Sequence, residues 1–317
     1  MPRLVTPLTL AIALAGWSVA AQQSQPQVYR GTAETVRVYA TVTDRDGRLV
    51  TNLTKDQFEV RDDGKPQPVV VFDNSPQPIQ LIVLLDVSGS MAGNLPLLRE
   101  SSRALFAELG ADDVARVGSF GREIVISPEF THDATALQNA LPEEIPPNAP
   151  TPLWRAVDQA MSVFDKKSDR RSVVMVLSDG RDDDRHFSMH MVTQVDVIDR
   201  ARKDDVMVYA IGLRNRLPPM TGMGTAQMMA AMNGSMPDPG LARTAEETGG
   251  GYAEVTLRDD LGAAFARIVR EMHSQYLLGY EPPRHDGKAH KIEVRVTGHG
   301  LEPRARKSYV APAQARE

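Results

Sequence analysis

No cysteine occurs among the 317 residues of this chain. Disulfide bonds, thiol catalysis and cysteine-ligated zinc sites are therefore excluded. The chain also has no excess of positive charge, since its formal net charge is -5 and its pI is about 5.9. A surface that binds nucleic acid is normally basic, so we expect no nucleic-acid partner.

Two catalytic motifs are missing as well. The sequence has no glycine-rich phosphate-binding loop of the P-loop form and no Gly-x-Ser-x-Gly nucleophile elbow. After the first 21 residues, no stretch is apolar over the roughly 20 residues that a membrane-spanning helix needs. The apolar share of 42% is nevertheless enough for a large core, and the length allows one large or two ordinary domains.

The first 21 residues have the pattern of a signal peptide. Arg3 precedes an apolar run over residues 4–17, and the small residues of 18–21 follow. We predict cleavage after Ala20 or Ala21; no cysteine follows, so the pattern is not that of a lipoprotein. The alternative is a short membrane anchor. We expect an exported protein, periplasmic or secreted, with no stable membrane span after cleavage.

The most informative stretch is an apolar run that ends in small polar residues. Residues 81–85 read as a strand buried on both faces, and Asp86, Ser88 and Ser90 follow at alternate positions. The segment of about 96–109 then has helical character. In open α/β sheets, a loop between such a strand and helix lies where ligands bind.

These side chains have the chemistry of hard cation ligands. Carboxylate and hydroxyl oxygens suit Mg²⁺, Ca²⁺ or Mn²⁺ rather than zinc or copper. One carboxylate and two hydroxyls do not fill a six-coordinate shell, so further oxygens are needed. Thr151, before a predicted helix, and Asp179, after a second buried strand at 173–177, are the candidates.

Three motifs in this order resemble a known family: Asp86-Val-Ser-Gly-Ser90, Thr151-Pro-Leu and Leu177-Ser-Asp-Gly180. They are similar to the von Willebrand factor type A (VWA) domain and match its metal-ion-dependent adhesion site. The resemblance covers about residues 78–273, and the flanking segments resemble a bacterial secreted VWFA-related subgroup. It implies one divalent cation at the top of a doubly wound α/β sheet, with these ligands: Asp86, Ser88, Ser90, Thr151 and Asp179.

The predicted fold class is therefore α/β, with a doubly wound, mostly parallel, Rossmann-like sheet. We expect a β module at 28–77, the VWA domain at 78–273 and a C-terminal β segment at 274–312. Neither β segment can bury a core alone, so we expect them to pair into one β-sandwich-like module. Val36, Val38, Ala40 and Val42 predict a half-buried strand in it.

Other features inside the α/β domain have more than one interpretation. Thr151 before Pro152 also fits a plain helix N-cap. The acidic run at 181–185 reads as a solvated loop, and His186 and His190, four residues apart, as surface histidines, although that spacing can bind zinc. The methionine-rich tract at 217–240 reads as an inserted loop with a short helix near 225–232, a partner surface or a Cu(I) site.

Three functions remain open after these exclusions. The first is a binding module that is not an enzyme, in which a divalent cation, Mg²⁺ first, captures an Asp or Glu carboxylate of a protein partner. The second is an envelope scaffold with a structural cation. The third is a metal-assisted hydrolase, which needs a general base that nothing in the sequence specifies.

Overall fold

The computed structural model describes residues 35–183, 191–214, 224–234, 236–256 and 260–313. The predicted signal peptide, His186 and His190 lie outside these residues. Among the described ranges, no helix is both long and apolar enough to cross a membrane.

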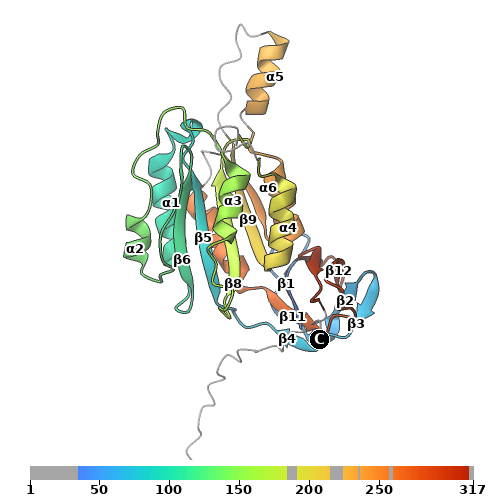
Figure 1. Cartoon of the computed structure of the whole chain (residues 1–317). Coiled ribbons are helices and arrows are strands. Elements are labelled where there is room, and N and C mark those ends of the chain that lie inside the picture. The colour runs from blue at the N-terminus through green and yellow to red at the C-terminus, as the bar shows by residue number, and fades with distance from the viewer. Residues whose placement is uncertain (1–34, 184–190, 215–223, 235, 257–259, 314–317) are drawn as a thin grey trace, which may run out of the picture.

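A six-stranded sheet forms the centre of the molecule, with strand order β10-β9-β8-β5-β6-β7 (Figure 1). Five strands are parallel, and only β7 at the edge runs antiparallel to its neighbour β6. Their bounds are β5 (Ile79–Asp86), β6 (Val114–Phe120), β7 (Ile124–Ile126), β8 (Arg171–Ser178), β9 (Val206–Arg214) and β10 (Tyr252–Thr256).

Helices cover both faces of this sheet, as the continuous apolar runs of β5, β8 and β9 require. The core on one face includes residues of α1, α2 and α7, and the core on the other includes residues of α3, α4 and α6. Their bounds are α1 (Leu95–Ala107), α2 (Ala134–Asn139), α3 (Leu153–Met161), α4 (Gln194–Asp204), α6 (Gly240–Thr248) and α7 (Leu261–His273). The predicted doubly wound α/β class is confirmed.

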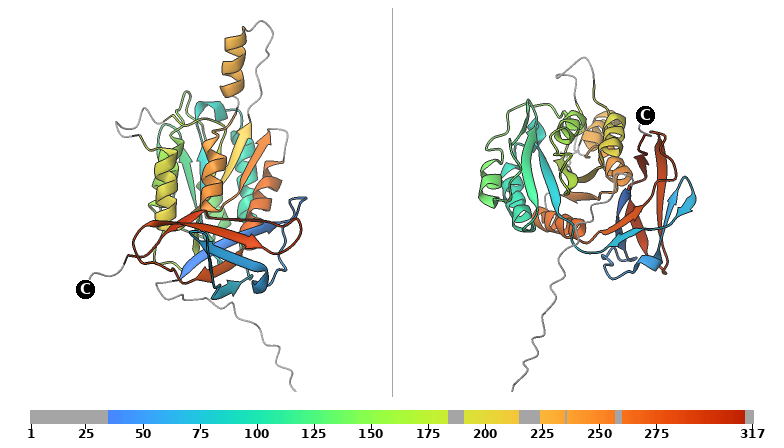
Figure 2. Two further views of the ribbon diagram at one scale, coloured as in Figure 1. Left: turned by 90° about the vertical axis from the view of Figure 1, so that its right-hand side faces the viewer. Right: turned by 60° about the horizontal axis from the view of Figure 1, so that its bottom comes forward.

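The segments before and after the α/β domain pair with each other at the amino ends of its strands (Figure 2). They form two four-stranded sheets, β13-β1-β11-β4 and β14-β12-β2-β3, which enclose an apolar core of their own. The strands are β1 (Val36–Thr43), β2 (Phe58–Asp62), β3 (Lys65–Gln67), β4 (Val71–Asp73), β11 (Tyr276–Tyr280), β12 (Ala289–Val296), β13 (Glu302–Ala305) and β14 (Ser308–Val310). This is the predicted β-sandwich-like module built from both ends of the chain.

One prediction for this module is wrong in detail. β1 is not half-buried: Tyr39 and Thr41 are buried as well. The β1 sheet lies between the sandwich core and the α/β domain, so both of its faces are covered. Two other strands of the module are short: the turn at Asp63 leads into β3, and β4 begins only at Val71.

Asp113 joins three elements at the amino end of the central sheet. Its carboxylate accepts hydrogen bonds from the Ile79 N–H (2.9 Å) and the Gly110 N–H (2.7 Å), and it lies 2.8 Å from His273 Nε2. Burial opposes ionisation of Asp113, but these three hydrogen bonds outweigh it and lower its pKa. The charged carboxylate therefore stabilises the fold.

We expect Asp113→Asn to lower the free energy of unfolding by about 2–4 kcal/mol, because an amide presents an N–H group where a backbone N–H needs an acceptor. The contribution of Asp113 is complete above the ordinary aspartate pKa of about 4 and is lost as the pH falls through its lowered pKa. Denaturant titrations at neutral and acidic pH measure both effects. Asp112→Asn, an exposed neighbour, is the matched control. Equal stability of the two variants at neutral pH would contradict this role.

Candidate metal centre

The predicted ligands lie at the carboxyl end of the central sheet, where the strand order changes direction. After β5 the chain adds β6 and β7 on one side and then crosses to add β8 on the other. The loops after β5 and β8 therefore diverge at this point, which is the usual place for a ligand in an open α/β sheet.

The loop after β5 carries three of the five predicted ligands. Asp86 is the last residue of β5 and is fully buried, and its Oδ1 accepts a hydrogen bond from the Ser88 N–H at 2.8 Å. The Ser88 and Ser90 hydroxyl oxygens are 3.1 Å apart. A short helix, η2 (Gly89–Met91), turns Ser90 towards the solvent. One side of the cluster is thus open.

The loop after β8 brings the second carboxylate against the first loop. Asp179, also fully buried, accepts a hydrogen bond from the Ser90 hydroxyl at 2.8 Å. Ser178 donates a hydrogen bond to Asp86 Oδ2. The structure therefore brings Asp86, Ser88, Ser90 and Asp179 together.

Thr151 belongs to a third loop that closes on the other two. The Gly89 N–H donates to the Ala149 carbonyl oxygen (3.2 Å), and the Asp183 N–H donates to the Thr151 carbonyl oxygen (2.7 Å). A Cβ atom on Gly180 would lie only 3.2 Å from Thr151 Oγ1, so glycine allows this close approach. Thr151 is buried beside the loop of Asp179, where its hydroxyl can complete the oxygen set.

The helix-cap interpretation of Thr151 is wrong. The N-cap of α3 is Pro152, and the side chain of Asp182 instead accepts a hydrogen bond from the Trp154 N–H at 3.1 Å. Asp182 therefore has a structural role that the interpretation of 181–185 as a solvated loop missed.

The electrostatics of the cluster favour a cation. Burial first, and then the negative charge of Asp179, raise the pKa of Asp86 to about 7. Two buried carboxylates at close range oppose each other's ionisation, and a divalent cation relieves both penalties. The donors are all oxygen atoms, as hard cations prefer. The residues present therefore fit a divalent cation, and the assignment of the five ligands stays a prediction.

The methionine-rich insert leaves the domain at the same end. Its helix α5 (Thr225–Gly234) extends beyond the carboxyl ends of the strands (Figure 1). The Asp238 N–H donates to the Gly180 carbonyl oxygen at 3.2 Å, which ties the end of the insert to the loop of Asp179. The short helix predicted near 225–232 is confirmed. Met229 and Met236 are exposed.

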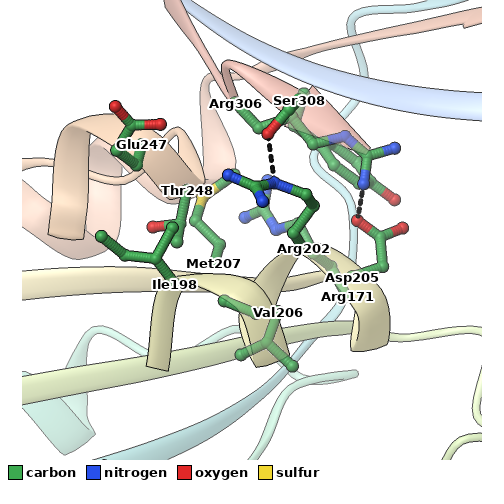
Figure 3. Close-up of a pocket in the computed structure, with 12 residues that line it drawn as sticks. Arg171, Ile198, Arg202, Asp205, Val206, Met207, Glu247, Thr248, Arg306 and Ser308 are labelled. Atoms are coloured by element: carbon green, nitrogen blue, oxygen red, sulfur yellow. Dashed lines mark hydrogen bonds and ion pairs between the residues drawn. The ribbon is translucent and has the colours of Figure 1, made fainter. Parts of the chain in front are cut away.

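A small cavity lies at the other end of the domain, against the sandwich (Figure 3). Arg202 donates to the Ser308 hydroxyl, and Arg306 pairs with Asp205. The cavity has a volume of about 20 Å³, which is enough for about one water molecule. The cavity is therefore a feature of the interface between the α/β domain and the sandwich.

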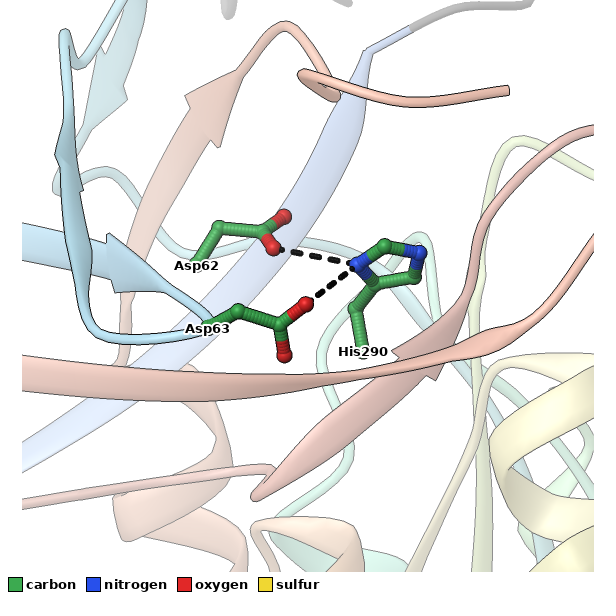
Figure 4. A group of neighbouring side chains, drawn as sticks. All are labelled: Asp62, Asp63 and His290. Carbon is green, nitrogen blue, oxygen red and sulfur yellow. Dashed lines mark ion pairs between the residues drawn. The ribbon is translucent and has the colours of Figure 1, made fainter. Parts of the chain in front are cut away.

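The sandwich holds a second group of possible metal ligands, which the sequence analysis missed. Asp62, Asp63 and His290 place one ligand atom each within 4.8 Å of one another (Figure 4). Asp62 and Asp63 are neighbours in the sequence but lie far from His290, and only the pairing of β2 with β12 brings the three together.

Fold and site together define a Rossmann-like α/β domain with a candidate divalent-cation site at the carboxyl ends of its strands. The family model described as von Willebrand factor type A domain matches residues 80–243, and the chain belongs to this family. Domains of this family are protein-interaction modules that often use a metal-ion-dependent adhesion site. The predicted resemblance is confirmed.

Solved structures match the chain at low identity. BatB from Bacteroides thetaiotaomicron is 17% identical, with a TM-score of 0.45 over 61% of this chain and 98% of that one. A von Willebrand factor type A protein from Catenulispora acidiphila is 12% identical (TM-score 0.48; 87% and 75% covered).

Proximal thread matrix protein 1 from the mussel byssus, with a zinc-occupied MIDAS motif, is 14% identical (TM-score 0.45; 68% and 50% covered). No curated protein matches the chain.

Proposed function

We propose that this protein is an exported binding module that captures an acidic group of a protein partner through a divalent cation. The cation, Mg²⁺ first, is held by Asp86, Ser88, Ser90, Thr151 and Asp179. The observation that carries the proposal is the pair of fully buried carboxylates, Asp86 and Asp179, joined to serine hydroxyls at an edge open to solvent. Export is supported by the signal-peptide pattern of residues 1–21.

The chemistry of the donor set supports capture of a carboxylate. Three of the five proposed ligands are neutral hydroxyls, so two carboxylates only balance the charge of the ion. Five protein donors also leave room for at least one water in a six-coordinate shell. An Asp or Glu side chain from a partner can replace that water and gains a charge-assisted contact with the ion.

The exposed methionines support a contact surface beside the ion. Met229, Met236 and Met191 are exposed, and Met236 lies two residues before Asp238, which is bonded to the loop of Asp179. Methionine side chains repack readily against different surfaces. We propose that the partner's acidic group reaches the ion while its apolar neighbours contact these side chains.

The test is capture of envelope proteins from the source organism by the immobilised mature protein, with Mg²⁺ or with a chelator. We expect capture that needs Mg²⁺, is absent with Asp179→Asn and is lost when carbodiimide amidation blocks the carboxylates of the extract. Asp169→Asn, an exposed residue just before β8, is the control. If the chelator lowers the melting temperature while capture persists, the cation is structural and the scaffold function is correct.

A further inference from the structure

Asp62, Asp63 and His290 meet where the two ends of the chain pair in the sandwich. Asp62 ends β2, Asp63 follows in the turn to β3, and His290 is the second residue of β12. His290 Nδ1 lies 3.3 Å from Asp62 Oδ1 and 2.9 Å from Asp63 Oδ2 (Figure 4). All three side chains thus direct one ligand atom at a common point.

The other polar atoms of these side chains are held by hydrogen bonds. Asp62 Oδ2 accepts from the Tyr280 hydroxyl (2.9 Å) and the Tyr309 hydroxyl (2.6 Å). Burial is the main cause that raises the pKa of both phenols, so they remain donors. Asp62 Oδ2 therefore already has two hydrogen-bond donors, and Asp62 Oδ1 faces His290.

Hydrogen bonds also fix the orientation of the Asp63 and His290 side chains. Asp63 Oδ1 accepts from the Lys291 N–H at 3.0 Å, and His290 Nε2 lies 3.0 Å from Asp286 Oδ1. When a carboxylate accepts a hydrogen bond from the Nε2–H of a histidine, the lone pair of Nδ1 is free for a metal. This arrangement is the usual support of a metal-bound histidine.

Two of the three atoms that face the common point, Asp62 Oδ1 and His290 Nδ1, are buried and lack hydrogen bonds among the described residues. Asp62 is 1% exposed and His290 is 3% exposed, yet Asp62 Oδ1 and His290 Nδ1 make no hydrogen bond within the described part of the chain. The two atoms lie 3.3 Å apart, and Asp63 Oδ2 lies 2.9 Å from His290 Nδ1, so a positive charge is needed at this point, either a proton on Nδ1 or a metal ion. The surroundings carry three carboxylates, those of Asp62, Asp63 and Asp286.

We propose that Asp62, Asp63 and His290 form a second metal site, which takes a divalent transition ion of the zinc type. A nitrogen donor beside two carboxylates suits Zn²⁺ better than Mg²⁺ or Ca²⁺. Tetrahedral zinc with bonds of about 2.0–2.1 Å places neighbouring ligand atoms about 3.3 Å apart. The two separations at His290 Nδ1, 3.3 and 2.9 Å, need little adjustment to reach that geometry.

Asp63 is exposed, so the fourth coordination position faces solvent and takes water. The site joins β2 to β12, two paired strands that come before and after the VWA domain in the sequence. A bound ion cross-links these ends and stabilises the folded sandwich, since the unfolded chain does not hold the three ligands together.

A proton on His290 is the competing occupant of this point. The hydrogen bond to Asp286 and the charges of Asp62 and Asp63 raise the pKa of His290, while burial lowers it. Arg284 lies 3.9 Å from Asp63 Oδ2 and is mostly exposed. One imidazolium and this guanidinium leave the three carboxylates with a net negative charge, and a divalent ion that replaces the proton on His290 neutralises it.

The test is a titration of Zn²⁺ into the metal-stripped full mature protein with a chelating indicator dye. The starting protein carries Asp179→Asn, which removes the proposed first site, and His186→Ala with His190→Ala, which removes the paired histidines. We expect one Zn²⁺ per chain in this protein and a higher melting temperature with Zn²⁺ but not with Mg²⁺.

Adding Asp63→Asn is expected to weaken Zn²⁺ binding by at least about 10–100-fold and to abolish the thermal shift. Asparagine tolerates the left-handed backbone of Asp63 (φ 47°) and can keep the bond from the Lys291 N–H, so the fold is retained. Asp46→Asn, in another exposed turn of the same module, is the matched control. The proposal is overturned if the starting protein binds no Zn²⁺, or if Asp63→Asn leaves its affinity unchanged.

Discussion

Asp179→Asn is expected to abolish saturable binding of Mg²⁺ and Mn²⁺ at the end of the central sheet. Loss of second-shell partners alone lowers metal affinity by about 10–100-fold, so loss of one of two charged ligands is expected to cost at least about 100-fold. The asparagine can still accept the hydrogen bond from Ser90, so the loop connection is preserved. Isothermal titration of the metal-stripped mature protein measures the effect.

The same variant is expected to fold as well as the wild type without metal. The charge of Asp179 is the second cause, after burial, that raises the pKa of Asp86. Removing this charge relieves a repulsion in the metal-free protein, so its melting temperature is expected to be equal or higher. Loss of binding with a retained fold separates ligand loss from unfolding. Undiminished Mg²⁺ affinity in Asp179→Asn would remove Asp179 from the ligand set.

Thr151→Val tests the hydroxyl of the third loop at nearly constant volume. A neutral ligand contributes less than a carboxylate, so we expect a smaller loss of affinity than with Asp179→Asn. Asp169→Asn serves as the charge-matched control for the titrations. Equal affinities for wild type and Thr151→Val would mean that water occupies the position assigned to Thr151.

Arg171→Ala is expected to cause the largest loss of stability, because Arg171 connects the α/β domain to the sandwich. Its guanidinium group donates to the Gln275 side-chain oxygen and to the Met272 carbonyl oxygen (2.9 Å). It also lies 4.7 Å from the centre of the Tyr39 ring. Gln275 in turn donates to the Thr41 hydroxyl at 2.8 Å.

Truncation of Arg171 leaves two buried oxygen acceptors without their charged donor and removes the contact with Tyr39. Hydrogen bonds to charged groups contribute about 1.5–3 kcal/mol each, and their losses are not additive, so we expect about 3–5 kcal/mol less stability. Urea titration followed by circular dichroism measures the change.

The neighbouring Arg170→Ala removes a more exposed guanidinium that donates to the Asp112 carbonyl oxygen, and it is expected to cost under about 1 kcal/mol. Arg171→Lys keeps the charge but not the planar fork, so it is expected to recover only part of the loss. Equal effects of the alanine substitutions at 170 and 171 would contradict a special role for Arg171.

Local patterns were sufficient for most of the α/β domain. The apolar runs of β5, β8 and β9 indicate strands covered on both faces, and helices of the α/β domain do cover them. Gly249 ends α6 in the left-handed conformation (φ 84°), as the glycines after that helix indicate. These features depend on near neighbours in the chain, which the sequence displays directly.

Patterns were insufficient where distant segments decide the environment. The alternation in β1 predicts one exposed face, but that face packs against the α/β domain, with Thr41 reaching the network of Arg171 through Gln275. The alternative interpretation of Thr151 as an N-cap is wrong, because Asp182 from another loop accepts the hydrogen bond at the start of α3. Such partners cannot be identified from local spacing.

The sequence by itself determined the α/β class, the family and the oxygen-donor chemistry of Asp86, Ser88, Ser90, Thr151 and Asp179. A short motif carries this chemistry because each loop keeps its ligands within a few residues. Only the tertiary structure decided that Asp62, Asp63 and His290 share one point and that Arg171 joins the two modules. Both arrangements arise from pairing of the two chain ends, and long-range strand pairing leaves no regular spacing in a sequence.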